Sequence, residues 1–136
     1  MEQGPMLLFR SAAFSAEPGE DEATNPGIFG KALATWLGAR LRERGVECRD
    51  VIAEDCGWCL PVGASSERTY VACASDGEPD DQSPGSWRVF AFRDGKLLAK
   101  LFGRSKDADS LEAIYTAVKD VLQAAPEVQD LQEEPA

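Results

Sequence analysis

NPGIFGKALATWLGARLRERGVECRDVIAEDCGWCL, residues 25–60, is the stretch that decides the fold. Its first part predicts a helix, because Asn25 can cap free backbone amides, Pro26 suits the first turn, and Gly45 suits the left-handed position that ends a helix. Its large apolar residues recur at helical spacing and form one stripe: Phe29, Leu33, Trp36, Leu37 and Leu41. The sequence therefore predicts an amphipathic helix that packs against a sheet or a second helix.

Residues 46–62 predict an extended segment. Counted as one strand, the segment places one set of mostly large, apolar residues on the core side: Ile52, Glu54, Cys56, Trp58 and Leu60. Because Arg40 and Arg44 share the arc of the apolar stripe, we expect one of them to form an ion pair with the inward Glu54. Two alternatives stay open: the arginines reach water at the helix end, or a bulge at Gly57 turns Asp55 inward.

The remaining segments complete an α+β domain. Apolar or β-branched runs indicate four further strands, at residues 7–14, 68–74, 86–93 and 96–102. Asp94-Gly95 predicts a tight hairpin turn between the last two, and a second amphipathic helix follows near residues 107–125. The predicted order is β-α-β-β-β-β-α, with both helices on one face of an antiparallel sheet. We expect one domain at residues 1–125 and an acidic, flexible tail at 126–136.

The charge of the chain is concentrated in loops. The 136 residues carry a formal net charge of −10, and the segments 15–24, 75–86 and 126–136 each hold four acidic residues and no basic one. The rest of the chain is close to neutral, so no coherent basic face is available to bind nucleic acid. The acidic segments fit a basic protein partner, although they also serve solubility alone.

Histidine is absent, which excludes serine–histidine and cysteine–histidine nucleophile pairs and histidine-ligated metal sites. The first residues carry an acid where a signal peptide has positive charge, and no apolar run reaches membrane-spanning length. We therefore expect a cytoplasmic protein with reduced cysteines and no membrane association.

Cys56 and Cys59 have the CxxC spacing of thiol redox proteins. No helix is predicted after them to stabilise a thiolate, and Glu54 and Asp55 oppose one through like charge. Cysteines three apart on a strand also point to opposite faces. The spacing gives little support to a four-cysteine zinc site, because such sites usually pair two closely spaced sets of cysteines and Cys48 and Cys73 are isolated in the sequence. We therefore interpret these cysteines as small packed side chains and expect no cofactor and no metal.

Three segments of the chain carry a family resemblance: Asn25-Pro26-Gly27, the Gly30-to-Leu37 part of the helix, and Glu54-Asp55 before Gly57-Trp58. The chain resembles a group of small bacterial proteins that share an NPG, GK-LA-WL and ED-GW arrangement over about its first half. The resemblance implies a bacterial, cytosolic origin and brings no established activity. Members of the group often have tryptophan at the position of Cys56, which implies that the CxxC spacing is incidental.

The sequence thus favours a non-enzymatic protein-interaction module of the inhibitor or immunity-like kind. Its candidate interaction or ligand surface consists of Glu54, Asp55 and Trp58. The alternative is a thiol redox or metal-binding protein that uses Cys56 and Cys59. The sequence does not specify an oligomeric state.

Overall fold

The computed structural model describes residues 2–63, 68–77, 79, 84–94 and 111–135. The strands are β1 (Glu2–Ser11), β2 (Ile52–Glu54), β3 (Gly57–Val62), β4 (Arg68–Ser75), β5 (Gly85–Asp94) and β6 (Gln129–Glu134). The helices are the 3-10 helix η1 (Glu20–Glu22) and the α-helices α1 (Lys31–Glu43) and α3 (Leu111–Ala124). The order β-α-β-β-β-β-α is confirmed, with both β2 and β3 inside the segment predicted as one strand, and a further strand follows α3. The predicted hairpin turn at Asp94-Gly95 and its second strand at 96–102 extend outside the described residues.

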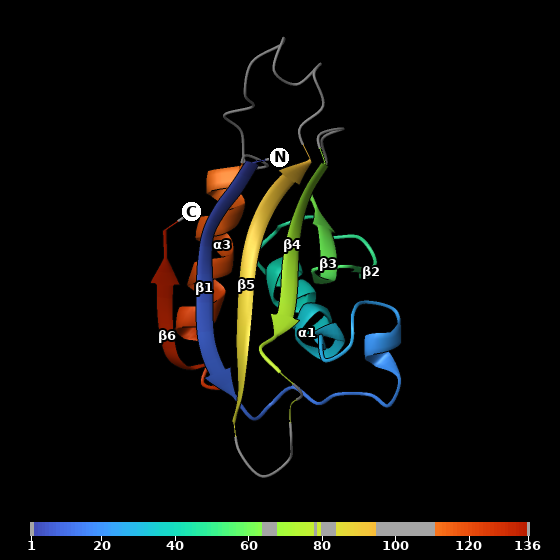
Figure 1. The fold of residues 1–136 in the computed structure, drawn as a ribbon. Helices are drawn as coiled ribbons and strands as arrows, with labels where there is room; N and C mark the ends of the chain where they lie inside the picture. The colour runs from blue at the N-terminus through green and yellow to red at the C-terminus, as the bar shows by residue number, and fades with distance from the viewer. Residues whose placement is uncertain (1, 64–67, 78, 80–83, 95–110, 136) are drawn as a thin grey trace.

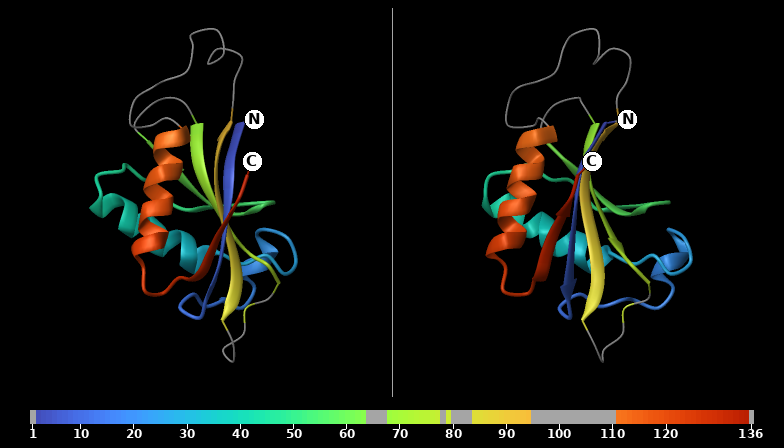
Figure 2. Two further views of the ribbon diagram at one scale, coloured as in Figure 1. Left: turned by 90° about the vertical axis from the view of Figure 1, so that its left-hand side faces the viewer. Right: turned by 60° about the vertical axis from the view of Figure 1, so that its left-hand side comes forward.

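All six strands belong to one antiparallel sheet in the order β2-β3-β4-β5-β1-β6. Figure 1 shows α1 and α3 behind this sheet, and the turned views of Figure 2 place both helices on the same side of it. The predicted α+β architecture, with two helices on one face, is therefore confirmed. We call the sheet surface that neither α1 nor α3 covers the open face. No helix in the described part of the chain is long and apolar enough to cross a membrane.

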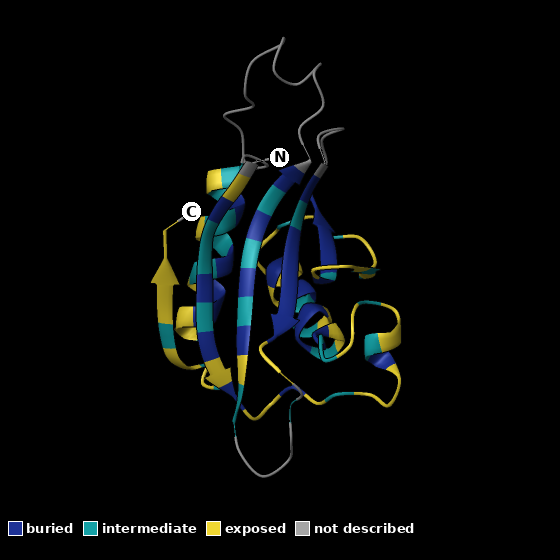
Figure 3. Ribbon diagram, in the orientation of Figure 1, coloured by how far each residue is buried: buried dark blue, intermediate teal, exposed yellow. Residues whose placement is uncertain are grey.

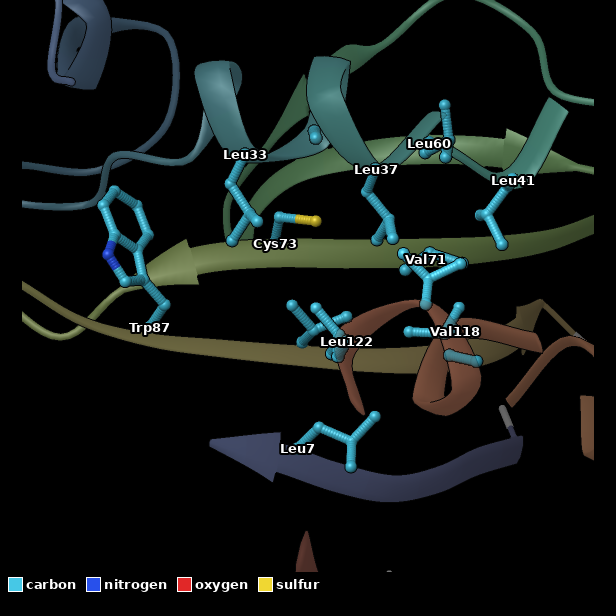
Figure 4. Packing of buried hydrophobic residues seen from close by; sticks show 14 of the residues in the cluster. Leu7, Leu33, Leu37, Leu41, Leu60, Val71, Cys73, Trp87, Val118 and Leu122 are labelled. Atoms are coloured by element: carbon cyan, nitrogen blue, oxygen red, sulfur yellow. The ribbon is translucent and has the colours of Figure 1, made fainter. Parts of the chain in front are cut away.

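The core fills the space between the helices and the sheet. Along β1 and β5, buried residues alternate with less buried ones, whereas β3 and β4 are buried at nearly every described position, as Figure 3 shows. Leu33, Leu37 and Leu41 of α1 are fully buried, as their predicted stripe requires. Figure 4 shows these leucines packed with residues of the sheet and of α3: Leu7, Leu60, Val71, Cys73, Trp87, Val118 and Leu122.

The start of α1 differs from the prediction, because the helix begins at Lys31 and not beside Asn25. The buried carboxylate of Glu20, in η1, caps it: Glu20 Oε2 accepts hydrogen bonds from the backbone N–H groups of Gly30 (2.8 Å) and Lys31 (3.1 Å). A side chain thus satisfies helix amides from outside the helix. The other end is as predicted, since α1 stops at Glu43 and Gly45 is left-handed with φ of 85°.

The segment predicted as one strand at residues 46–62 is a hairpin. Glu54 pairs with Gly57, so Asp55 and Cys56 form a two-residue turn between β2 and β3. Because the chain reverses there, the single alternation expected across this segment is broken. Leu60 faces α1, where its side chain lies close to Gly38, whereas Ile52 and Glu54 lie on the open face.

Residues 129–134 were expected in a flexible tail and instead form β6. This strand pairs with β1, which would otherwise leave a row of backbone N–H and C=O groups unpaired at the sheet edge. Leu131 also packs against the core. A single apolar anchor suffices because backbone hydrogen bonds supply most of the contact, so a polar sequence can still dock as an edge strand.

Candidate functional site

The predicted ion pair between Glu54 and Arg40 or Arg44 is absent among the described residues. Glu54 is exposed on the open face, because the turn at Asp55 and Cys56 sets its register against Gly57 and directs it away from α1. The guanidinium group of Arg40 lies 3.1 Å from Glu43 Oε1 on the same helix, and Arg44 is exposed. These arginines therefore follow the alternative reading, with their charged groups in water at the end of α1.

Glu54, Asp55 and Trp58 do not form one surface. Trp58 is partly buried on the side of the sheet that carries the helices, and the Lys31 ammonium lies 5.6 Å from its ring centroid, at cation–π distance. Asp55 is exposed at the hairpin turn, and its backbone carbonyl accepts a 2.8 Å hydrogen bond from the Asn25 side chain. The segments that carry the family resemblance thus meet at one corner of the fold, where they join the loop before α1 to the β2–β3 hairpin.

Two glycines of the same segments pack against the backbone of β4. A Cβ atom at Gly30 would lie 2.3 Å from the carbonyl oxygen of Cys73, and one at Gly57 would lie 2.5 Å from it. Such distances leave no room for a side chain. The glycines therefore have a structural role, because they let these segments approach the backbone of β4 closely. This packing accounts for glycine at both positions without a catalytic role.

The structure brings Cys56 and Cys59 close together, contrary to the expectation that they point apart. Cys56 is exposed at the turn and Cys59 is fully buried on β3. Burial above all, and then the neighbouring Cys56 and Glu54, raise the pKa of the Cys59 thiol. Burial likewise raises the pKa of Cys73. Cys59 and Cys73 are thus held as neutral thiols, the state least suited to nucleophilic attack or metal binding.

No metal centre is formed by the described residues: among them, no group of three or more cysteine, aspartate or glutamate side chains is arranged to hold an ion. The described parts of the chain offer a surface in its place. A row of paired residues crosses the open face from edge to edge: Ile52, Cys59, Ala72, Phe90, Met6 and Glu134. Cys59 and Ala72 are fully buried, so the accessible part of this row lies on β5 and β1 and at the two edges.

The aromatic residues of the open face form a contiguous ladder. Tyr70 and Phe92 are paired across β4 and β5, with ring centroids 5.2 Å apart and planes 22° from parallel. Phe90 lies beside Phe92 at 5.8 Å. The three rings are partly exposed, as are Met6 and Leu8 on the adjacent strand. A solvated sheet face normally carries polar residues at these positions, so this apolar set requires an explanation beyond the fold.

Sequence reasoning overlooked this surface, although a signal for it was present. Residues 89–92 are all apolar, Val-Phe-Ala-Phe, where a strand with one solvated face alternates apolar with polar residues. Val89 and Ala91 supply the core, which leaves Phe90 and Phe92 for the other face. The continuous apolar run therefore indicated a sheet with two apolar faces.

Comparisons with protein-family models, with curated proteins and with solved structures found no match for the chain. The functional argument therefore depends on the residues of the chain itself.

Proposed function

We propose that the protein is a cytoplasmic, non-enzymatic interaction module that binds a basic protein partner on the open face of its sheet. The observation that supports this most is the partly exposed ladder of Tyr70, Phe90 and Phe92, which is fixed on three neighbouring strand positions. Aromatic side chains dominate the centres of protein interfaces because they bury large areas at low cost in conformational entropy. Covering about 400 Å² of apolar surface would contribute on the order of 10 kcal/mol before the costs of association.

The charges around the open face favour a basic partner over a second copy of the chain. Glu54 lies at the β2 edge of this face, and Glu134 lies opposite Met6 at the β6 edge, while Arg10 and Arg88 at one end lie beside Asp76 and Asp130. Two copies that met face to face would bring these acidic edges together while each carries a formal net charge of −10. Like-charge contact of this kind opposes association, whereas basic side chains around an apolar centre would complement both features.

Photo-cross-linking in cells tests the location of binding. A photoreactive phenylalanine analogue replaces Phe90 in one variant and the exposed Thr35 of α1 in a matched control. We expect a discrete cross-linked protein with a basic binding surface from position 90 and not from position 35. Equal cross-linking from both positions, or none from position 90, would contradict binding at the open face.

Calorimetric titration with the purified partner then tests the energetics. Phe92→Ser should weaken binding at least about tenfold, because it removes a central aromatic contact, while Thr35→Ala should bind as the wild type does. Added salt should weaken binding, since screening reduces the attraction between acidic edges and a basic surface. Affinity that is unchanged in Phe92→Ser would rule out this ladder as the contact.

A thiol redox function is the second candidate, and the proximity of Cys56 and Cys59 supports it. Titration of the native protein with a thiol-specific reagent tests it. If the cysteines serve packing, only the exposed Cys56 should react fast, Cys56→Ser should remove that fast phase, and denaturant should release all four thiols. Reversible formation of a Cys56–Cys59 disulfide in a redox buffer, with a potential near that of cytosolic thiols, would favour the redox function instead.

A further inference from the structure

One end of the open face contains a pocket of about 440 Å³, between β1, β5 and β6. Figure 1 shows the end of β1 beside the start of β6 at this place. Among the described residues, four charged ones line the pocket, two of each sign: Arg10, Arg88, Asp76 and Asp130. Leu8 contributes apolar wall. The volume lies within the range typical of small-molecule sites.

The two arginines lie side by side, and neither has a partner among the residues that the structure describes. Leu8 pairs with Arg88 and Arg10 pairs with Ser86, so the arginines are diagonal neighbours on the same face of β1 and β5. Neither guanidinium group has an ion pair or hydrogen bond within the described part of the chain. Adjacent like charges on a sheet are unfavourable unless an anion joins them. Guanidinium groups bind carboxylates through paired hydrogen bonds.

The two aspartates supply the opposite charge in the same pocket. Neither forms an ion pair with Arg10 or Arg88 among the described residues, although all four line one cavity. Asp130 has φ of 54°, and the register between β1 and β6 shifts between Leu8 and Arg10. This irregularity interrupts the strand ladder beside the pocket. β-Bulges at such places change the direction of side chains and are frequent beside binding sites.

We infer that this pocket binds a small zwitterion, with its carboxylate at Arg10 and Arg88 and its cationic group at Asp76 and Asp130. Two arginines and two aspartates together suit a ligand that carries charges of both signs. A phosphate dianion would gain from the arginines and be repelled by both aspartates. A free amino acid and a peptide that ends in lysine share the required chemistry. This inference does not depend on the proposed protein partner.

NMR titration of the full chain tests the inference, with the side-chain N–H signals of Arg10 and Arg88 as reporters. The probes are L-lysine and acetyl-Gly-Lys, which carry both charged groups, and L-lysinamide and acetate, which each lack one. We expect saturable shifts with L-lysine or acetyl-Gly-Lys, and binding at least about tenfold weaker for lysinamide and acetate, since each loses a charged contact. Tighter binding of L-lysine indicates a free amino acid, and tighter binding of acetyl-Gly-Lys indicates a peptide.

Substitutions locate the site. Arg88→Met should weaken binding about tenfold or more, and so should Arg10→Met at the more exposed arginine. Arg44→Met, at an exposed position just after α1, should bind as the wild type does. Asp76→Asn should weaken the binding of L-lysine but not that of acetate, because the substitution removes attraction for the cationic group alone. The inference is overturned if no probe gives saturable shifts, if lysinamide binds as tightly as lysine, or if both pocket arginine variants retain full affinity.

Discussion

Gly57 is the residue at which backbone geometry and packing together exclude a side chain. Its φ is 142°, and a Cβ atom would lie 2.5 Å from the carbonyl oxygen of Cys73. We predict that Gly57→Ala lowers the free energy of unfolding by about 3 kcal/mol or more, measured by urea denaturation. Gly77→Ala is the control, since Gly77 has φ of 90° with open space around it and should lose only about 1–2 kcal/mol. Equal losses would show that close approach to β4 is unimportant.

Glu20 gives a second prediction at this scale. Its buried carboxylate accepts hydrogen bonds from Gly30 and Lys31, and from the backbone N–H of Glu17 at 3.2 Å. Glu20→Ala should reduce the free energy of unfolding by about 2 kcal/mol, because it leaves buried helix amides without acceptors. Glu22→Ala, at an exposed position of the same short helix, should change stability little. A Glu20→Ala variant as stable as the wild type would contradict the capping role.

At the scale of elements, β6 docks by pairing with β1, by packing Leu131 against the core and by a contact with α3. Lys119 Nζ lies 2.6 Å from Glu133 Oε2, and this hydrogen bond lowers the pKa of Glu133 below its usual value of 4.5. A lowered pKa means that the contact stabilises the folded state above about pH 4.5 and is lost as the pH falls through the folded-state pKa.

Hydrogen exchange measures this pH dependence. We predict that the protection factors of the amides of β6 fall on acidification below about pH 4.5 while those of β5, at the centre of the sheet, stay high. Lys119→Met should lower protection in β6 at neutral pH and flatten its acid dependence. If the protection factors of the β6 amides depend neither on pH nor on Lys119, the pairing with β1 alone holds β6 in place, and the prediction is wrong.

At the scale of the whole molecule, one layer of helices gives the two sheet faces different tolerance to charge. Leu7 and Leu8 are the same residue type at adjacent positions, but Leu7 is 1% exposed against the helices and Leu8 lies partly exposed on the open face. Leu7→Lys should cost about 4 kcal/mol or more, or prevent folding, whereas Leu8→Lys should cost about 1 kcal/mol. Circular dichroism with thermal melting measures the difference, and equal losses would mean that the open face is covered.

Local patterns were sufficient for the elements whose stabilising contacts lie within one segment. The stripe of α1, its end at Gly45 and the order of the elements all depend on spacing within a helix or strand, so the sequence by itself determined them. The predicted stripe is correct although the predicted helix start is wrong, because the spacing of Leu33, Leu37 and Leu41 is the same whether the helix begins at Asn25 or at Lys31.

Tertiary structure alone decided the features that depend on partners distant in the chain. The reversal at Asp55 and Cys56 moved Glu54 to the open face, Glu20 capped a helix from another segment, and β6 formed from a polar sequence. Each arises because backbone amides and carbonyls must find hydrogen-bond partners wherever the folded chain supplies them. The periodicity of side chains within one segment does not identify partners elsewhere in the chain. The candidate surface and its pocket could therefore be recognised only from the pairing of the strands.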